Sequence, residues 1–202
     1  MSLSMNGLKF AFIGFLILSV VIIGSAAAVV AFYSQQLPSV ETLKDVQLQT
    51  PLKVFSRDKK LIAVFGEKRR IPIASDEITV RLVNAFLAAE DDRFFSHPGV
   101  DYQGIVRAGI KLITTGRKAQ GGSTITMQLA RNFFLTPERT YTRKIKEILL
   151  ALRIEKTLTK HEILELYLNK IYLGQRAYGV GAAAEVYYGR SIHELTLAQL
   201  AI

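Results

Sequence analysis

Three consecutive acidic residues, Glu90, Asp91 and Asp92, stand where an apolar helical pattern ends. Carboxylates there face the negative end of the helix dipole, which destabilises the helix by about 0.3–1 kcal/mol for each. Glu90 follows Leu82 and Phe86 at four-residue steps, so we expect its carboxylate to be partly desolvated and close to the other two acids. Both effects raise the pKa of a carboxyl group, which suits general acid or base catalysis. The alternative is a charged helix end exposed to water.

A second candidate site lies at a glycine loop, Gly121 and Gly122, which precedes a predicted helix over residues 125–134. Unpaired N–H groups at such a helix start form a natural anion site. The alternative is a plain glycine loop with a capped helix. The candidate N-caps and the flanking cations are Ser123, Thr124, Thr126, Arg117, Lys118 and Arg131.

Glu147 is the third candidate, with Arg143 four residues and Lys144 three residues before it. This is the weaker order for helix pairs, because a glutamate that precedes its lysine interacts better. A carboxylate held among cations has a lowered pKa and stays ionised, ready to orient a cation or to hold a metal beside a phosphate. An ordinary solvated charge cluster is the alternative. Glu147 should lie on a different face from the buried stripe of this helix, which we predict as Ile145, Ile148, Leu149 and Leu152.

An uncharged apolar run over residues 10–33 is long enough for the roughly 20 residues that a membrane-spanning helix needs. We interpret it as a transmembrane signal anchor, because a cleaved signal peptide has a shorter apolar core of about 7 to 15 residues. Cleavage is the alternative. Lys9 precedes the span, so the positive-inside rule places residues 1–9 in the cytoplasm and the rest of the chain outside. Residues 34–50 are polar and unpatterned, and we expect a linker.

The remaining chain predicts a mainly α-helical domain. Two β-branched and aromatic runs on either side of residues 57–60 predict a β-hairpin, and a helical pattern then continues almost to the end. Thr159 and Glu162 fit a capping box, the small residues of 179–189 predict close helix packing, and His97 is expected to be a structural hydrogen-bonding residue in a turn. The helical pattern breaks at residues 96–101, 114–123, 135–140, 158–160, 173–179 and 187–191.

The net charge of +9 is local. Residues 107–176 hold fourteen Lys or Arg against five Asp or Glu, a difference of nine, whereas the remaining residues hold twelve of each. Such a region attracts phosphates, and a membrane-tethered domain outside the cytoplasm seldom meets nucleic acid, so we expect lipid phosphates as partners. The chain has no cysteine, which excludes a disulfide framework and a thiolate metal site. His161 lacks the second histidine of a zinc-hydrolase helix.

Five successive segments together resemble a known family, and they read EDDRFFSHPG, GGSTITMQLARN, RKIKE, KHEILELYLNKIYLG and GVGAAAEVYYG. In order and spacing they resemble the five motifs of the peptidoglycan glycosyltransferase domain, glycosyltransferase family 51, of class A penicillin-binding proteins and monofunctional transglycosylases. The resemblance covers residues 51–202, and residues 10–33 match the family's signal anchor. It implies a mainly α, lysozyme-like domain with a hydrophobic jaw that dips into the outer leaflet. It also implies a C-terminally truncated domain, because the family continues with further helices and, in class A proteins, with a transpeptidase domain.

The resemblance implies an inverting enzyme on the periplasmic or outer side of a bacterial cytoplasmic membrane. Such enzymes polymerise lipid II into β-1,4-linked glycan strands and release undecaprenyl pyrophosphate. Glu90 matches the general base that deprotonates the acceptor 4-hydroxyl, and Glu147 matches a second glutamate that helps the pyrophosphate leave, commonly with a weakly held Mg²⁺ or Mn²⁺. Met127 replaces a frequent glutamine of the second motif and is left out of the site. The candidate substrate-binding residues are Asp91, Lys118, Ser123, Thr124, Thr126, Gln128, Arg131, Arg143 and Lys144.

Lipid II, the growing lipid-linked glycan, membrane lipids and cell-wall synthesis proteins are the expected partners. Two other classes of function remain open. A non-catalytic, membrane-anchored module could bind anionic lipid or glycan through the basic region, and this binding would weaken with salt. A lysozyme-like hydrolase would cut finished glycan, although cleavage of a neutral glycosidic bond leaves no pyrophosphate for the basic region to stabilise.

Overall fold

The computed structural model describes residues 5–46, 48–66, 69–116, 122–138 and 140–201, and the chain divides into two units, Met1–Pro38 and Ser39–Ile202. The first unit contains one long helix, α1 (Met5–Ser34). The segment Phe12–Ser34 of this helix is long and apolar enough to cross a membrane, and none of it is buried within the structure. The helix contains the whole apolar run 10–33 that the sequence predicted as a span.

The second unit begins before the predicted domain start. Residues 34–50 were expected to be a linker, but a short 3₁₀ helix (Glu41–Leu43) lies within them, and the side chains of Val40 and Leu43 are buried. The backbone carbonyl of Gln49 accepts a hydrogen bond from Arg70. Residues 39–50 therefore belong to the second unit of the structure.

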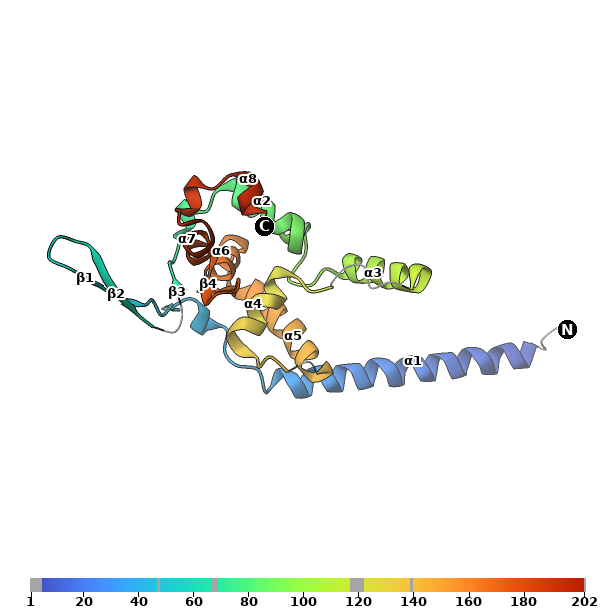
Figure 1. The fold of residues 1–202 in the computed structure, drawn as a ribbon. Coiled ribbons are helices and arrows are strands. Elements are labelled where there is room, and N and C mark those ends of the chain that lie inside the picture. Colours follow the sequence, from blue (N-terminus) through green and yellow to red (C-terminus); the bar gives the residue numbers. More distant parts are fainter. Residues whose placement is uncertain (1–4, 47, 67–68, 117–121, 139, 202) are drawn as a thin grey trace. The chain divides into compact units, whose positions relative to one another are not determined.

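The predicted hairpin is confirmed. Strand β1 (Leu52–Phe55) pairs antiparallel with β2 (Leu61–Phe65), with Leu52 opposite Phe65 (Figure 1). The turn places Lys59 at a φ of 61°, a left-handed conformation that is uncommon outside glycine. Two further strands of two residues each, β3 (Arg69–Arg70) and β4 (Ala177–Tyr178), pair in parallel.

Helices are the main secondary structure of the second unit, as the sequence predicted, and the predicted breaks lie between the helices or overlap their ends. They are α2 (Val80–Glu90), α3 (Tyr102–Thr115), α4 (Ile125–Phe134), α5 (Tyr141–Thr157), α6 (Lys160–Lys170), α7 (Val180–Tyr188) and α8 (Leu197–Leu200). Local chemistry sets their starts, because a threonine or aspartate side chain accepts a hydrogen bond from the first turn of each of them except α7. The capping box of Thr159 and Glu162 is confirmed. Three short 3₁₀ helices complete the unit, namely Ser75–Glu77, Phe94–Ser96 and Ile192–Glu194.

Helix α4 lies at the centre of the core, where it packs against both α5 and α6 (Figure 1). A fully buried leucine or isoleucine contributes about 1.5–3 kcal/mol relative to an exposed one, so these helix pairs hold the unit together. The buried apolar residues of the three helices are Ile125, Met127, Leu129 and Ala130 of α4, Leu150, Ala151 and Ile154 of α5, and Ile163, Leu164, Tyr167 and Leu168 of α6.

The predicted buried stripe of α5 is only partly present, because Ile148 and Leu152 pack against the core cluster of Val100, Met127 and Ala151 without being fully buried. Its predicted members, Ile145, Ile148, Leu149 and Leu152, are only half-buried. The fully buried residues of the helix are Glu147, Leu150, Ala151 and Ile154, so the acidic residue lies inside. The hydrophobic pattern of a helix limits the faces that can be buried, and the neighbouring helices decide which one is.

The predicted close packing of the 179–189 segment is confirmed at Gly181, in the first turn of α7. A Cβ atom at this position would lie 2.3 Å from the carbonyl oxygen of Ile71. At Gly179, where φ is 86°, a Cβ atom would lie 2.8 Å from the carbonyl oxygen of Asn169. Glycine thus allows α7 to approach two backbone segments that any side chain would push away.

Candidate active site

A polar cavity of about 360 Å³ brings together the acidic end of α2 and the start of α4. Among the residues that line it are Glu90, Asp92, Ser123, Gln128 and Arg131. Two of the three sequence segments that we singled out for their chemistry therefore meet around one space. A second, mostly apolar cavity of about 570 Å³, bounded mainly by α2, α7 and α8, shares Ala89 and Glu90 with the first.

Glu90 is the last residue of α2, and its side chain is exposed. The expectation that its carboxylate is partly desolvated is wrong, because burial falls along the predicted stripe of α2, from the buried Leu82 through the half-buried Phe86 to the exposed Glu90. The Gln128 side chain of α4 donates a hydrogen bond of 2.8 Å from Nε2 to Glu90 Oε2. Glu90 is thus an accessible carboxylate with one fixed amide donor.

Asp91 has a different environment from its neighbour, because its carboxylate is buried and has protein partners. One oxygen accepts a hydrogen bond of 3.0 Å from the backbone N–H of Ile125, at the first position of α4. The Nε2 atom of His97 lies 2.9 Å from Oδ1 and 3.0 Å from Oδ2. Asp91 lines the cavity, but its carboxylate mainly joins the end of α2 to the start of α4.

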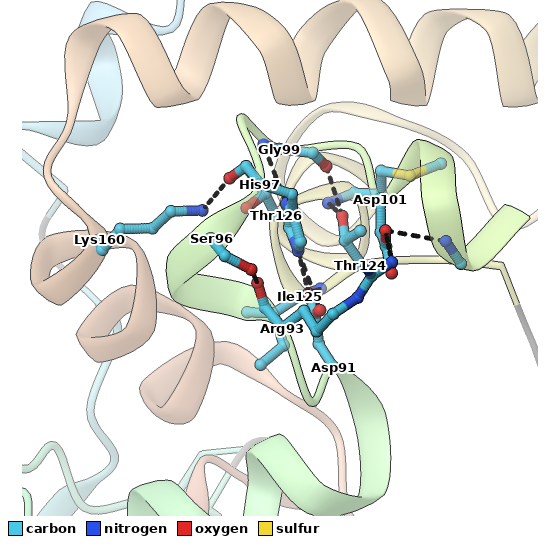
Figure 2. A network of polar contacts seen from close by, with 12 residues as sticks. Asp91, Arg93, Ser96, His97, Gly99, Asp101, Thr124, Ile125, Thr126 and Lys160 are labelled. Carbon is cyan, nitrogen blue, oxygen red and sulfur yellow. Dashed lines mark hydrogen bonds and ion pairs between the residues drawn. The ribbon is translucent and has the colours of Figure 1, made fainter.

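His97 is confirmed as a structural residue of the turn. The N–H of Gly99 donates a hydrogen bond of 3.2 Å to His97 Nδ1, so this nitrogen carries a lone pair and Nε2 carries the hydrogen that points at Asp91. The carbonyl of His97 accepts a bond of 2.7 Å from Lys160, and the carbonyl of Gly99 accepts one of 2.6 Å from Thr124 (Figure 2). The loop after Glu90 is therefore fixed to both α4 and α6.

The start of α4 does not offer the free anion site that the sequence predicted. The N–H of Ile125 is bonded to Asp91, and the N–H of Met127 donates to the Thr124 hydroxyl at 3.2 Å, which makes Thr124 the N-cap. Two groups from within the chain thus take the positions that a phosphate would use. An anion in the cavity has to rely on cationic side chains instead.

Glu147 lies buried between two cations. Its Oε1 atom is paired with Arg143, and its Oε2 atom lies 3.0 Å from Lys144 Nζ. The predicted grouping of these three side chains is therefore present, but in a buried position and not in a solvated cluster. Lys144 also donates a hydrogen bond of 2.6 Å to the hydroxyl of Ser123, which lines the polar cavity. Glu147 is thus connected to the space around Glu90 through Lys144 and Ser123.

Of the predicted substrate-binding residues, Thr126, Arg143 and Lys144 do not line this space, and Thr124 lines it with a hydroxyl that already has partners. Thr126 is fully buried, and its hydroxyl donates a hydrogen bond of 2.6 Å to Glu155, so it joins α4 to α5 instead of lining the cavity. The hydroxyl of Thr124 is likewise used by Gly99 and Met127. Lys118 lies outside the described residues.

Three further charged residues line the cavity, namely Asp92, which the sequence placed beside Glu90 without a role in the site, and Asp101 and Arg107, which we did not predict. A hydrogen bond from Arg93 lowers the pKa of the Asp101 carboxyl below its ordinary value, and the N–H of Gly104 adds to the effect. Asp101 is also the N-cap of α3, a role that its position before a helical pattern could have indicated. Arg107 belongs to the basic region 107–176, but that pattern does not show which of its cations meet.

The described residues contain no group of three or more His, Asp or Glu side chains that could hold a metal ion. Glu147, the predicted ligand, has both oxygens engaged by cations, which would repel Mg²⁺ or Mn²⁺. The side chains that the structure describes around Glu147 therefore do not fit a protein-held divalent cation, because such ions prefer several oxygen ligands.

Comparison with known proteins identifies the family. The transglycosylase family model matches residues 58–202. The chain belongs to the transglycosylase family. Penicillin-binding protein 1A of Escherichia coli (strain K12) is 58% identical over 192 residues, which is 93% of this chain and 23% of that protein. Penicillin-binding protein 1A of Pseudomonas aeruginosa is 58% identical over 171 residues, 85% of this chain and 21% of that protein.

This transglycosylase chain spans between a fifth and a quarter of the length of those two relatives. Among solved structures, penicillin-binding protein 1A from Haemophilus influenzae is 32% identical, with a TM-score of 0.37, and the match covers 77% of this chain and 14% of that one. The family resemblance stated from the sequence motifs is confirmed by the family model and by these relatives.

Proposed function

We propose that this chain is a peptidoglycan glycosyltransferase that polymerises lipid II into β-1,4-linked glycan strands. One observation carries the proposal: an accessible carboxylate, Glu90, lines the same cavity as Ser123 and Arg131, and Ser123 connects this space to the pair of Lys144 and Glu147. Transfer to a sugar hydroxyl needs a base near the acceptor and positive charge near a leaving phosphate. The cavity has both.

In the proposed reaction, Glu90 takes the proton of the acceptor 4-hydroxyl as that oxygen attacks the anomeric carbon of the donor. The bond between the anomeric carbon and the pyrophosphate oxygen breaks, and the electron pair leaves with undecaprenyl pyrophosphate. Attack from the face opposite the leaving group converts the α-linked donor into a β-1,4 linkage, by the two-sided logic of inverting glycosidases with a sugar hydroxyl in place of water. Glu90 borders two cavities, so a donor and an acceptor can both approach it.

Lys144 and Arg131 are the cations that we propose to stabilise the departing pyrophosphate. Glu147 acts through Lys144, because it holds the ammonium group 3.0 Å from its own Oε2 atom and within reach of Ser123. Arg143, on the other oxygen of Glu147, completes this arrangement. The preorganised cations then face the charge that develops on the leaving oxygen, at no further cost of reorganisation.

We propose that α1 anchors the enzyme in the bacterial cytoplasmic membrane, with the second unit on the outer side, where its lipid-linked substrates would be. Lipid II, the growing glycan, membrane lipids and other cell-wall synthesis proteins remain the predicted partners. A weakly held Mg²⁺ or Mn²⁺ also remains a prediction, and the pyrophosphate would have to provide most of its ligands. Loss of polymerisation after exhaustive chelation, restored by added Mg²⁺, would support it.

The decisive experiment is lipid II polymerisation by the full chain in detergent, with Glu90→Gln as the test variant. A general base contributes about 10²–10⁴-fold to the rate, so we expect a loss of that size. Glu185→Gln, which removes an exposed glutamate of α7 outside both cavities, is the matched control and should polymerise normally. Undiminished synthesis by folded Glu90→Gln would reject the assigned base.

Glu147→Gln tests the leaving-group side of the proposal. Removal of one preorganised electrostatic contact in an active site lowers kcat by about 10²–10³-fold, and we expect a loss in this range. Incubation of the unmodified chain with finished glycan strands separates the alternatives, since a hydrolase would shorten them. Salt-sensitive binding of lipid II without any product would indicate the non-catalytic module.

A further inference from the structure

Tyr167 of α6 lies behind the amide that contacts Glu90. The residue is fully buried, and its hydroxyl points at Gln128 Oε1 across 3.5 Å, which is longer than the roughly 2.5–3.0 Å of an ordinary O–H···O hydrogen bond and makes this a weak donor contact. Gln128 Nε2 in turn donates to Glu90 Oε2 at 2.8 Å. Three side chains from α6, α4 and α2 thus form a line that runs from the core to the cavity.

The chemistry of the three groups fixes the direction of this line. An ionised carboxylate only accepts hydrogen bonds, so the NH₂ of Gln128 has to face Glu90 and its oxygen has to face Tyr167. The phenol must then donate. Burial, and next the charge of Glu90, raise the pKa of Tyr167 well above its ordinary value, so the hydroxyl keeps its proton at every physiological pH.

We propose that Tyr167 is a positioning residue for the base, which holds the Gln128 amide with its NH₂ group toward Glu90. The inference rests on the proposed function, in which Glu90 is the general base. With the amide held in this way, the ionised form of Glu90 receives a hydrogen bond. A flipped amide would turn an oxygen toward the carboxylate and would favour the protonated, inactive form.

The ring and the hydroxyl of Tyr167 have separable roles. The ring packs edge-on against Phe86 with a centroid distance of 6.1 Å, one turn before Glu90 on α2. Tyr167→Phe keeps this contact and removes only the hydroxyl. The Gln128 oxygen then loses its donor, so the flipped amide is less disfavoured when Glu90 is protonated, while the packing between α6 and α2 is preserved.

The expected effect is a change in the pH dependence. Without the hydroxyl, a flipped Gln128 can accept a hydrogen bond from protonated Glu90, so the acid limb of the pH–kcat/KM profile moves to higher pH by roughly 0.5–1 unit. At pH values on the acid limb, kcat/KM of Tyr167→Phe is then about 3–10-fold lower than that of the unmodified chain. The substitution leaves unchanged the other charged groups that line the cavity beside Glu90, namely Asp91, Asp92, Asp101, Arg107 and Arg131.

The test measures two quantities on the full chain in detergent. The first is the pH–kcat/KM profile of lipid II polymerisation for the unmodified chain, for Tyr167→Phe and for the control Tyr141→Phe, whose residue is 93% exposed. The second is the pH titration of the Glu90 carboxyl carbon by ¹³C NMR, assigned with Glu90→Gln, which does not depend on activity. We expect both midpoints to move upward in Tyr167→Phe and neither to move in Tyr141→Phe.

A double-mutant comparison then tests whether the effect passes through Gln128. Gln128→Leu should move the Glu90 titration upward by at least as much as Tyr167→Phe does, and adding Tyr167→Phe to it should produce no further shift. An unchanged Glu90 titration in folded Tyr167→Phe would overturn the inference, whatever the activity. Absence of polymerisation by the unmodified chain would reject the proposed function alone, because the titration still decides the role of Tyr167.

Discussion

Replacing Asp91 by asparagine should destabilise the second unit by about 3–5 kcal/mol. The substitution keeps the size of the side chain but changes one acceptor oxygen into an NH₂ donor. In the structure the carboxylate accepts hydrogen bonds from the N–H of Ile125 and from His97 Nε2. An asparagine oxygen in the Oδ2 position would still lie 3.0 Å from both donors, but its NH₂ group would replace Oδ1 and lie 2.9 Å from His97 Nε2, so that one donor faces another.

The magnitude follows from the buried position of the group. A hydrogen bond to a charged group contributes about 1.5–3 kcal/mol, and a buried donor left without a partner costs about 1–3 kcal/mol more. His97 cannot relieve the conflict by moving its hydrogen to Nδ1, because that atom accepts from the N–H of Gly99 at 3.2 Å. The substitution also removes the favourable interaction between the negative charge of Asp91 and the dipole at the start of α4.

The assay is urea unfolding of the full chain in detergent, followed by the near-UV circular dichroism of its tyrosines. Asp92→Asn is the matched control, because Asp92 is the exposed neighbour and its replacement should change the free energy of unfolding by less than about 0.5 kcal/mol. A loss below about 1 kcal/mol in Asp91→Asn would show that the carboxylate does not join α2 to α4 as described.

Two further predictions concern stability. Gly181→Ala should lower the free energy of unfolding by about 1–3 kcal/mol, because its Cβ would lie 2.3 Å from a backbone oxygen. The control Gly109→Ala, with open space around its Cβ, should raise the free energy of unfolding by up to about 1 kcal/mol. Equal effects of the two substitutions would refute the packing argument. Asp101→Asn should be less stable than the unmodified chain at pH 7, and the difference should vanish at low pH. The folded-state pKa of Asp101 is lowered, so the carboxylate stabilises the fold above the unfolded-state pKa of about 3.9, and this stabilisation is lost as pH falls through the folded-state pKa. A difference in urea midpoints that does not change with pH would contradict this role of Asp101.

The sequence was sufficient for features that depend on neighbouring residues. Helix starts were readable because their caps are local, as with Thr159 and Glu162, and the hairpin was readable from two short runs around a polar turn. The parallel pairing of β3 with β4 was not readable, because strands of two residues carry no periodic signal and lie far apart in the chain. The buried face of α5 was partly misassigned for a related reason, since it depends on how α4 packs against α5.

Within the site, residue types were predicted better than their partners. The grouping of Glu147 with Arg143 and Lys144 follows from spacing on one helix, and it is present in the structure. The contact of Asp91 with Ile125 joins residues that are 34 positions apart, and no local pattern indicates it. The line from Tyr167 to Glu90 was missed because Tyr167 fits the apolar face of its helix and gives no other signal.

The two adjacent acids at the end of α2 therefore serve different purposes, and burial separates them. Asp91 is buried and occupies the first N–H of α4, so the helix start is neutralised from within the chain. A phosphate in the cavity then meets Arg131 and the Lys144–Ser123 pair, and not a free helix end. Under the proposed function, binding of a lipid pyrophosphate should accordingly depend on these cationic side chains and on salt, while Glu90, which is exposed and contacts a single amide, would take the proton.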